Sequence, residues 1–550
     1  MDPKIYWKQN LSGGINSATD NALIENNESP LLKNISLDRV GNWASRKGTE
    51  LLGSVTAGSD RVWGLGAYDK SDGTHTFFRV CNRDLEKFNG TDTWSVVDSD
   101  EWTASKKVNT INFLDRLYLG CEDGTTPLSY TTTTTITDIV PTIGGHHLAV
   151  NKSVLAVGGN NMKPNVIFYS DPYTDKFYSA TETCSANADS NGANTVVTTA
   201  SVFEADIEGG MIYNSTEGVL RTILDWHTAT VPYVTTDAST STWDNDTVYV
   251  MQNVFTQDGK VTGIVGFLGN FVSFDEDNMY VWDPLSNSSS KLPGFGCVNE
   301  RTIQIVDGNL IWANREGIYL WAGGDTRPID ISLKLKDSVN GYGIWDLINN
   351  TWAQLASGTL DNKYYLSLGD LSTQTGAPAS ALTNTELVMD IQKGTWVLNT
   401  RDDEPVVYAT FINSSGEKDL YYGEKTAIAV YKINTGTTDD DSAGTGTAFT
   451  LEAQTPHYTF PDPTVEYRIV AYYVKYKSGG DVTITTSVNG GTYSAVDVLS
   501  SSSTITTEKI LPPTEKQGFT HSLKFTCSST MQIEAVGFEA IPISFGKVST

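Results

Sequence analysis

The chain has 550 residues, of which 39% are hydrophobic and 19% charged, and a formal net charge of −27 at pH 7. This length exceeds one ordinary hydrophobic core, so about two to four domains are expected. The remainder is rich in Thr, Ser, Asn and Gly, which excludes a helical bundle and a disordered acidic chain. The charge argues against binding nucleic acid through clustered Lys and Arg. It fits a soluble acidic surface, or a surface over which DNA passes without adhering.

The first residues, Met1-Asp2-Pro3-Lys4-Ile5-Tyr6-Trp7, lack the basic segment and apolar core of a secretory signal, so none is expected. No run approaches the roughly 18 consecutive apolar residues that span a bilayer, so no stable membrane association is expected. The five cysteines show none of the CxxC spacing of a zinc site or a disulfide framework. They are interpreted as reduced core thiols of a protein made in a reducing cytoplasm. They are Cys81, Cys121, Cys184, Cys297 and Cys527.

Residues 1–55 indicate an extended arm with turns, able to add strands to a neighbour or to the rim of the domain that follows. From about residue 60 to 435, short apolar runs recur, each closed by a Gly, Asn or Asp turn. Two paired strands cannot bury their faces alone, so such units need stacked neighbours. Repetition at roughly 35–50 residues is typical of propeller blades. We predict a β-propeller of about six or seven blades over 56–180 and 253–435, with a stack of β-sandwiches as the competing interpretation.

One repeat is interrupted after Tyr178, where a stretch rich in Thr, Ser, Asn and Ala precedes further alternating strands. This pattern predicts a small β-barrel at 181–252, inserted in a blade loop, because closing a longer loop costs little extra. A second composition break, at 435–446, indicates a linker or long loop. Beyond it, alternating strands and the Asn489-Gly490-Gly491 turn predict a C-terminal β-sandwich over 436–550. The expected fold class is therefore all-β.

The sequence offers no catalytic constellation. It contains no GxSxG elbow, HExxH motif, Walker loop or dinucleotide fingerprint. His146 and His147 are adjacent, so on a strand they are expected to point to opposite faces and not to share a metal ion. Asp439, Asp440 and Asp441 fit a solvated acidic loop better than a calcium site. We therefore predict no catalytic, cofactor-binding or metal-binding residues, no cofactor and no enzymatic activity.

Two features of glycosidase propellers have loose counterparts in the sequence. Sialidase-type blades carry Ser-x-Asp-x-Gly-x-Thr-Trp boxes, and Ser71-Asp72-Gly73-Thr74 is a loose echo of them that fits a hairpin turn better. Six tryptophans could line a sugar site, but they lie in or at the ends of apolar strands and are expected in the core. They are Trp282, Trp312, Trp321, Trp345, Trp352 and Trp396.

Three pieces of the chain resemble parts of phage virion proteins, and together they cover about half of it. The opening residues resemble the start of many such proteins; they are Leu11-Ser12-Gly13-Gly14-Ile15-Asn16, Ile24, Glu28-Ser29-Pro30, Asn34-Ile35, Gly41 and Arg46-Lys47-Gly48. Residues 213–218 with 231–250 resemble a small barrel module of phage tail proteins. The C-terminal region resembles the sandwich that follows phage propellers, on the basis of Phe460-Pro461-Asp462-Pro463, Tyr467-Arg468 and Asn489-Gly490-Gly491.

In kind, the chain resembles the tail nozzle, or tail-accessory DNA-stabilising hub, of short-tailed phages. The resemblance implies a structural virion protein in the tail, made in the host cytoplasm and assembled as a homohexameric ring. That ring would lie below the portal and adaptor proteins, carry docking surfaces for tail fibres, and retain or conduct the genome through its channel. Contact with genomic DNA would be transient and non-specific. Two alternatives stay open: a tail fibre or receptor-binding spike, and a carbohydrate-binding or carbohydrate-active propeller.

Overall fold

The computed structural model describes residues 3–18, 23–38, 41–55, 60–90, 92–124, 128–130, 136–138, 144–184, 194–198, 207–227, 233–238, 240, 243–286, 288–336, 343–348, 352–372, 382–413 and 415–543. Met1 and Asp2, much of the Thr/Ser-rich stretch (185–193 and 199–206) and Val231 of the predicted barrel module lie outside this set. Within it, no helix is both long and apolar enough to cross a membrane. The helices described are short 3-10 turns: η3 (Glu300–Thr302), η4 (Leu333–Leu335), η5 (Trp345–Leu347) and η6 (Trp352–Gln354).

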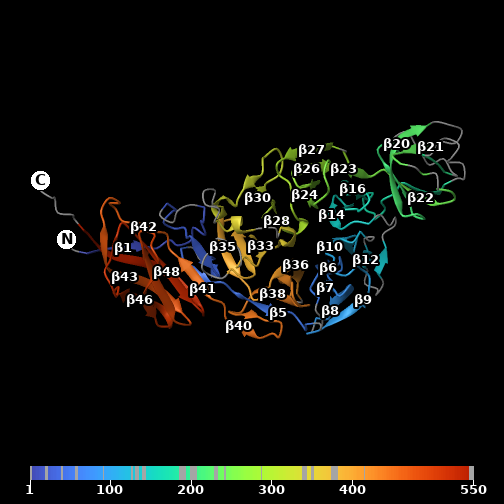
Figure 1. Cartoon of the computed structure of the whole chain (residues 1–550). Helices are drawn as coiled ribbons and strands as arrows, with labels where there is room; N and C mark the ends of the chain where they lie inside the picture. The colour runs from blue at the N-terminus through green and yellow to red at the C-terminus, as the bar shows by residue number, and fades with distance from the viewer. Residues whose placement is uncertain are drawn as a thin grey trace.

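The middle of the chain is a β-propeller, and its described residues form seven four-stranded blades (Figure 1). Blade 1 comprises β6 (Gly64–Asp69), β7 (His75–Cys81), β8 (Asp84–Phe88) and β9 (Trp94–Asp98). Blade 2 comprises β10 (Val108–Phe113), β11 (Arg116–Cys121), β12 (Leu128–Tyr130) and β13 (Ile136–Asp138). Blade 3 comprises β14 (His147–Asn151), β15 (Val154–Gly158), β16 (Val166–Tyr169) and β23 (Val254–Thr256). Blade 4 comprises β24 (Gly263–Phe267), β25 (Asn270–Phe274), β26 (Asn278–Asp283) and β27 (Ser288–Pro293).

The remaining blades complete the ring. Blade 5 comprises β28 (Gln304–Val306), β29 (Asn309–Ala313), β30 (Ile318–Trp321) and β31 (Ile329–Asp330). Blade 6 comprises β32 (Ala356–Leu360), β33 (Lys363–Gly369), β34 (Thr385–Asp390) and β35 (Thr395–Thr400). Blade 7 comprises β36 (Pro405–Ile412), β37 (Lys418–Glu424) and β38 (Val430–Thr435), completed by β5 (Gly48–Leu51) from the N-terminal arm. The first strand of the last blade, β36, contacts the first strand of the first blade, β6, so the ring is closed.

Tight turns and apolar blade faces explain why this sequence forms blades. Several inner hairpins turn in two residues that both have positive φ, as at Lys152-Ser153 (46° and 59°) and Asp307-Gly308 (49° and 74°). Such turns match the twist of paired strands. Apolar side chains then fill the space between neighbouring blades. Phe77 of blade 1 stacks on Phe411 of blade 7, with ring centroids 5.0 Å apart, and so seals the junction where the ring closes.

The insertion in blade 3 is a small β-barrel, seen at one end of the molecule in Figure 1. Its sheet has the order β17-β22-β19-β20-β21-β18, and an antiparallel bridge between Cys184 and Thr198 joins the two end strands. That bridge closes the sheet on itself around a core that includes Ile212 and Trp243. The strands are β17 (Ala180–Thr183), β18 (Thr195–Val197), β19 (Met211–Asn214), β20 (Val219–His227), β21 (Tyr233–Thr236) and β22 (Thr247–Met251).

The opposite end is a two-sheet sandwich in which both ends of the chain meet (Figure 1). One sheet contains β43, β46, β47 and β49, extended by β1, β3 and β4 of the arm. The other contains β41, β42, β44, β45 and β48. The C-terminal strands are β41 (Leu451–Gln454), β42 (Tyr458–Thr459), β43 (Tyr467–Ser478), β44 (Val482–Val488), β45 (Ser494–Leu499), β46 (Ser502–Ile510), β47 (Lys516–Gly518), β48 (Thr520–Cys527) and β49 (Met531–Pro542). The arm strands are β1 (Lys4–Lys8), β2 (Leu31–Lys33), β3 (Ile35–Ser36) and β4 (Trp43–Ser45).

Strand β2 makes one continuous sheet out of the propeller and the sandwich. It pairs in parallel with β35 of blade 6, through Lys33 and Leu398, and antiparallel with β41 of the sandwich. The arm therefore adds strands to three places: the sandwich, the edge of blade 6 and blade 7. The segment 435–446, expected to be a linker or long loop, is not a free linker. It contains β39 (Asp439–Asp440) and the start of β40 (Gly446–Thr447), and β39 pairs with β5 of blade 7.

Candidate functional site

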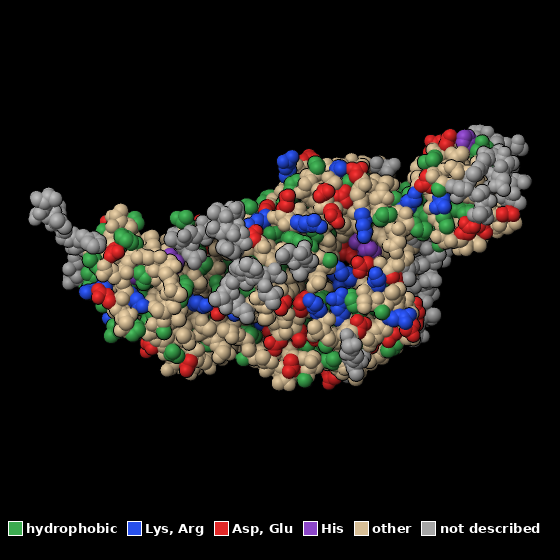
Figure 2. Space-filling view, in the orientation of Figure 1, with side chains coloured by type: hydrophobic (Ala, Val, Ile, Leu, Met, Phe, Trp, Pro, Cys, Tyr) green, Lys and Arg blue, Asp and Glu red, His purple; other side chains and the backbone are tan. Residues whose placement is uncertain are grey.

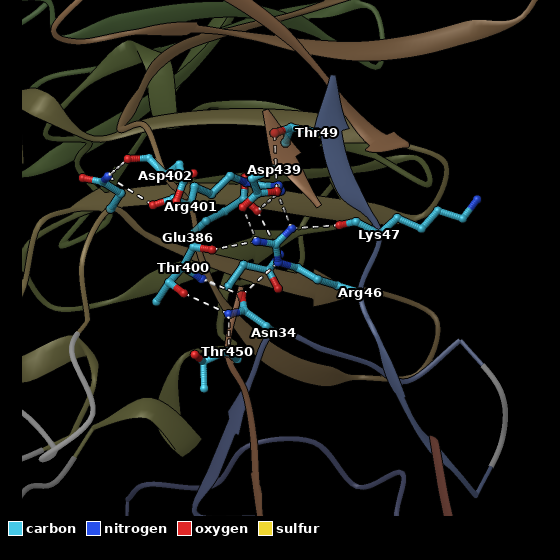
Figure 3. Close-up of polar contacts among 12 residues, drawn as sticks. Asn34, Arg46, Lys47, Thr49, Glu386, Thr400, Arg401, Asp402, Asp439 and Thr450 are labelled. Carbon is cyan, nitrogen blue, oxygen red and sulfur yellow. Dashed lines mark hydrogen bonds and ion pairs between the residues drawn. The ribbon is translucent and has the colours of Figure 1, made fainter. Parts of the chain in front are cut away.

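The joint between propeller, arm and sandwich is held by buried polar side chains (Figure 3). Its centre is Arg46, whose side chain is 5% exposed and forms an ion pair with Asp439, which is 2% exposed. Two hydrogen bonds, of 2.8 and 2.5 Å, join the guanidinium to the two carboxylate oxygens. Arg46 also donates to the backbone oxygen of Thr400 in blade 6. This one side chain thus contacts blade 6 and the segment that leads to the sandwich.

A second arginine completes a buried group of two positive and two negative charges. Arg401 forms an ion pair with Glu386 at 2.6 Å and lies 4.0 Å from Asp439. Burial lowers the pKa of Arg46 despite its bond to Asp439. Burial opposes the charged form of Arg401 as well, but Glu386 and Asp439 raise its pKa well above the usual range. Each charge in the joint is therefore paired, as buried charges must be.

Asn34 connects the same joint to the sandwich. Its carbonyl oxygen accepts hydrogen bonds from Arg46 Nε and from the backbone N–H of Thr400. Its amide nitrogen donates to Thr400 Oγ1 and to the backbone oxygen of Thr450. Gly48, two residues after Arg46, lies so close to Thr438 that a Cβ there would fall 1.7 Å from the Thr438 carbonyl oxygen. The joint therefore requires an amide at position 34, a guanidinium at position 46 and a glycine at position 48.

The arm makes a further contact with the propeller through Glu28 and Ser29. Glu28 accepts a hydrogen bond from Asn16 and pairs with Lys334 of η4, at 2.7 Å. Burial alone would raise the pKa of Glu28, but the bonds from Lys334 and Asn16 lower it. Ser29 donates to the backbone oxygen of Gln454 in the sandwich. The Glu-Ser-Pro piece therefore bridges the same two domains as Asn34 and Arg46.

The acidic run Asp439-Asp440-Asp441 is not the solvated loop that was expected. Asp439 pairs with Arg46, and Asp440 accepts a hydrogen bond from the backbone N–H of Leu51. Asp441 holds a turn by accepting from the backbone N–H groups of Ala443 and Thr445. Two of the three carboxylates thus bind the arm, and no calcium site is assigned to them.

A second polar site lies in the central channel of the propeller, which encloses about 430 Å³. The innermost strands line it, together with Glu300 and Arg301 of η3. Arg301 reaches across one mouth and donates to the backbone oxygens of Trp63, Val108 and Val406, which belong to blades or blade entries on the far side. This volume suits a small molecule or water rather than a macromolecule, and Arg301 closes the mouth.

His146 and His147 lie beside this mouth, and their rings are not on opposite faces as expected. The ring centroids are 4.0 Å apart because β14 begins only at His147, after Gly144 and Gly145 with positive φ. The possible metal-binding atoms of His146, His147 and Glu300 all lie within 4.8 Å of one another. Figure 2 shows histidine side chains near the centre of the propeller, flanked by basic and acidic ones.

Charge and burial at this mouth shift several pKa values. Burial, with the neighbouring His147, lowers the pKa of His146 to about 4. Burial would raise the pKa of Glu300, but His147, His146 and Asn109 together lower it to about 2. Burial together with Arg301 lowers the pKa of Lys107 to about 8. A neutral His146 and an ionised Glu300 therefore lie side by side near pH 7.

Other candidate residues take structural positions. Ser71-Asp72-Gly73-Thr74 forms the turn between β6 and β7, with Asp72 accepting from the backbone N–H of Thr74. All five cysteines are free and buried, as expected. Five of the six tryptophans are core residues and Trp352 is half-buried. The buried ones are Trp282, Trp312, Trp321, Trp345 and Trp396.

Comparison with known proteins finds only distant structural similarity. No family model matches the sequence, and no curated protein matches it. A streptogramin B lyase structure is 9% identical, with a TM-score of 0.38, over 70% of this chain and 98% of that chain. Sqt1 of Saccharomyces cerevisiae is 8% identical, with a TM-score of 0.35, over 70% and 100%. A chain of a mitotic checkpoint complex is 11% identical, with a TM-score of 0.33, over 78% and 92%. Such distant similarity concerns the propeller fold alone.

Proposed function

We propose that the chain is a non-enzymatic structural subunit of the tail of a short-tailed bacteriophage, a nozzle-type hub that assembles as a homohexameric ring. The observation that carries the proposal is where the phage-like residues of the arm lie. Glu28, Asn34 and Arg46 lie at the joint and fix the propeller to the sandwich. The pattern that resembles phage virion proteins is thus the part that makes a rigid body of two domains.

A rigid joint suits a mechanical role. A ring that retains packaged DNA under load must transmit force between domains without hinging. Here a continuous sheet through β2 and a buried charge group both cross the boundary. Relative domain motion is the default where domains meet only through a small interface. Here it would have to break the backbone pairing of β2 with β35 and β41 as well.

The route of the genome follows from the channel. The propeller's own channel holds about 430 Å³ and Arg301 closes one mouth. A DNA duplex therefore cannot use it, and in the proposed hub the duplex passes between subunits, along the axis of the ring. The formal net charge of −27 favours passage without adhesion, since like charges repel.

The test is the mass and shape of the purified full chain, alone and mixed with a portal–adaptor complex, by light scattering and negative-stain imaging. We expect a six-fold ring with a central hole, formed by the chain alone or only on the complex; the mixture without the chain is the control. A trimeric rod would overturn the proposal in favour of a fibre. A lasting monomer that binds polysaccharide would overturn it in favour of a carbohydrate-directed propeller.

A further inference from the structure

We propose that His146, His147 and Glu300 form a binding site for one divalent transition-metal ion of the zinc class, at the mouth of the central channel. The inference is independent of the tail role. Two histidines and one glutamate, with a fourth position open to water, are a common zinc ligand set. The donor atoms lie within 4.8 Å of one another, against roughly 3.3 Å between donors on a tetrahedral zinc ion. Binding therefore needs the widest pair of donor atoms to close by about 1.5 Å. His147 Nδ1 and Glu300 Oε2, which are in direct hydrogen-bond contact, must instead move apart to admit the ion.

The hydrogen bonds of His147 leave the right atom for a ligand. Its Nε2 lies 3.0 Å from the backbone oxygen of Val261, which only accepts, so Nε2 carries a hydrogen. The other ring nitrogen, Nδ1, faces Glu300 Oε2. Two facing acceptors need either a proton or a cation between them. An imidazole that donates its second N–H to a backbone carbonyl is the arrangement that orients most metal-binding histidines.

His146 is the residue that favours a cation over a proton. Its Nδ1 is buried and has no hydrogen-bond partner. An ion pair between His147 and Glu300 would use one proton and leave this buried nitrogen without a hydrogen-bond partner, which is unfavourable. A metal ion accepts a lone pair from both rings at once.

The surroundings hold the three ligands in place. Asn109 of blade 2 donates to Glu300 and to the backbone oxygen of His146. Gly159 gives the rings their room, because a Cβ there would lie 2.7 Å from a ring carbon of each histidine. The nearby cation of Arg301 is directed elsewhere, since both terminal nitrogens donate to backbone oxygens across the channel. Glu300 also lines the channel.

The test is binding of Zn²⁺ by the full chain after treatment with a chelator and dialysis, followed by calorimetry, with Co²⁺ absorption as the report of tetrahedral geometry. We expect one equivalent per chain. His146→Ala should weaken binding by about 100-fold or more, and Asn109→Ala, which removes only a supporting bond, by roughly 10–100-fold. His75→Asn is the matched control, because His75 is half-buried on blade 1 and pairs there with Asp69; it should leave the affinity unchanged.

Two results would overturn the site. One is Zn²⁺ affinity that is the same in the wild-type chain and in His146→Ala, which would leave His147 and Glu300 as a protonated ion pair only. The other is a Co²⁺ complex that lacks tetrahedral absorption and is lost equally in His75→Asn. Circular dichroism of each variant checks folding. Asn109→Ala keeps all three ligands, so it decides the matter if His146→Ala fails to fold.

Discussion

The guanidinium of Arg46 and the carboxylate of Asp439 join positions 393 residues apart in a two-pronged ion pair that is almost fully buried. The neighbours of Arg46 and Asp439 in the sequence do not explain why a charged residue stands at either position. Each is compensated by the other and by the neighbouring pair of Arg401 and Glu386. The presence of the ion pair between Arg46 and Asp439 therefore indicates that the arm is packed in the joint.

Replacing Asp439 with Asn should destabilise the chain by about 3–5 kcal/mol, because it leaves the Arg46 charge buried without its partner. The measurement is urea denaturation followed by tryptophan fluorescence. Asp441→Asn is the control, since an asparagine oxygen can accept the same turn bonds; it should change stability by no more than about 0.5 kcal/mol. Equal midpoints for the two variants would contradict the role given to the pair.

The continuity of the sheet through β2 can be tested at Leu32, which is 0% exposed. Leu32→Ala should cost about 2–5 kcal/mol, as large-to-small changes in packed cores do. Leu23 of the same arm is 77% exposed, and Leu23→Ala should cost no more than about 0.5 kcal/mol. Thermal unfolding compares them. A Leu32→Ala chain as stable as Leu23→Ala would mean that β2 adds little to the joint.

Asp403 makes stability depend on pH. Burial raises its pKa to about 7, and the neighbouring Glu424 adds to the shift while a bond from Tyr431 opposes it. The folded chain therefore binds a proton more tightly than the unfolded chain, whose aspartate titrates near 4. The contribution is favourable at low pH and is lost as pH rises from about 4 to about 7.

Asp403→Asn should remove that loss, so its stability relative to the wild-type chain should increase between pH 5 and pH 8. Denaturation midpoints across this range give the measurement. Asp361→Asn, in an exposed hairpin turn with a φ of 54°, is the control and should leave the slope as it is. If the pH profiles of Asp403→Asn and the wild-type chain were parallel, the carboxyl of Asp403 would titrate normally in the folded wild-type chain.

The thiols provide a check on the packing of the whole molecule. Burial raises the pKa of Cys121, Cys184 and Cys297 to about 12. It also raises the pKa of Cys81 and of Cys527. A buried, protonated thiol is inert. The native chain should therefore not react with Ellman's reagent at pH 8, and five thiols should appear after denaturation. Rapid labelling of a native thiol would show that its blade or barrel opens readily.

The blades were predictable because their signal is local. Apolar runs, tight turns and regular spacing all lie within about 50 residues. The strands β25 and β26, for example, follow one another in the sequence and pair antiparallel. The inserted barrel and the sandwich were predictable on the same basis. The number of blades was predicted only as six or seven, because the seventh borrows β5 from the arm, far away in the sequence.

Both polar sites were predicted wrongly from the sequence, because their contacts join residues that are far apart in the chain. Asp439 was expected in solvent because its partner, Arg46, is far away in the sequence and no local pattern indicates the ion pair. His146 and His147 were expected on opposite faces because strand geometry was applied to a residue that precedes the strand. Glu300 belongs to another blade, and only the closed ring brings it to the histidines.

Completion of blade 7 by β5 sets an order on synthesis. The strand leaves the ribosome early, but its partner β38 ends at residue 435, so the ring cannot be closed until most of the polypeptide has been translated. The first residues wait longer still, because β1 pairs with β49 near the other terminus. The nascent chain thus contains an unclosed ring of blades whose edge strands lack their pairing partners. Late translation is therefore the stage at which it most needs protection from aggregation.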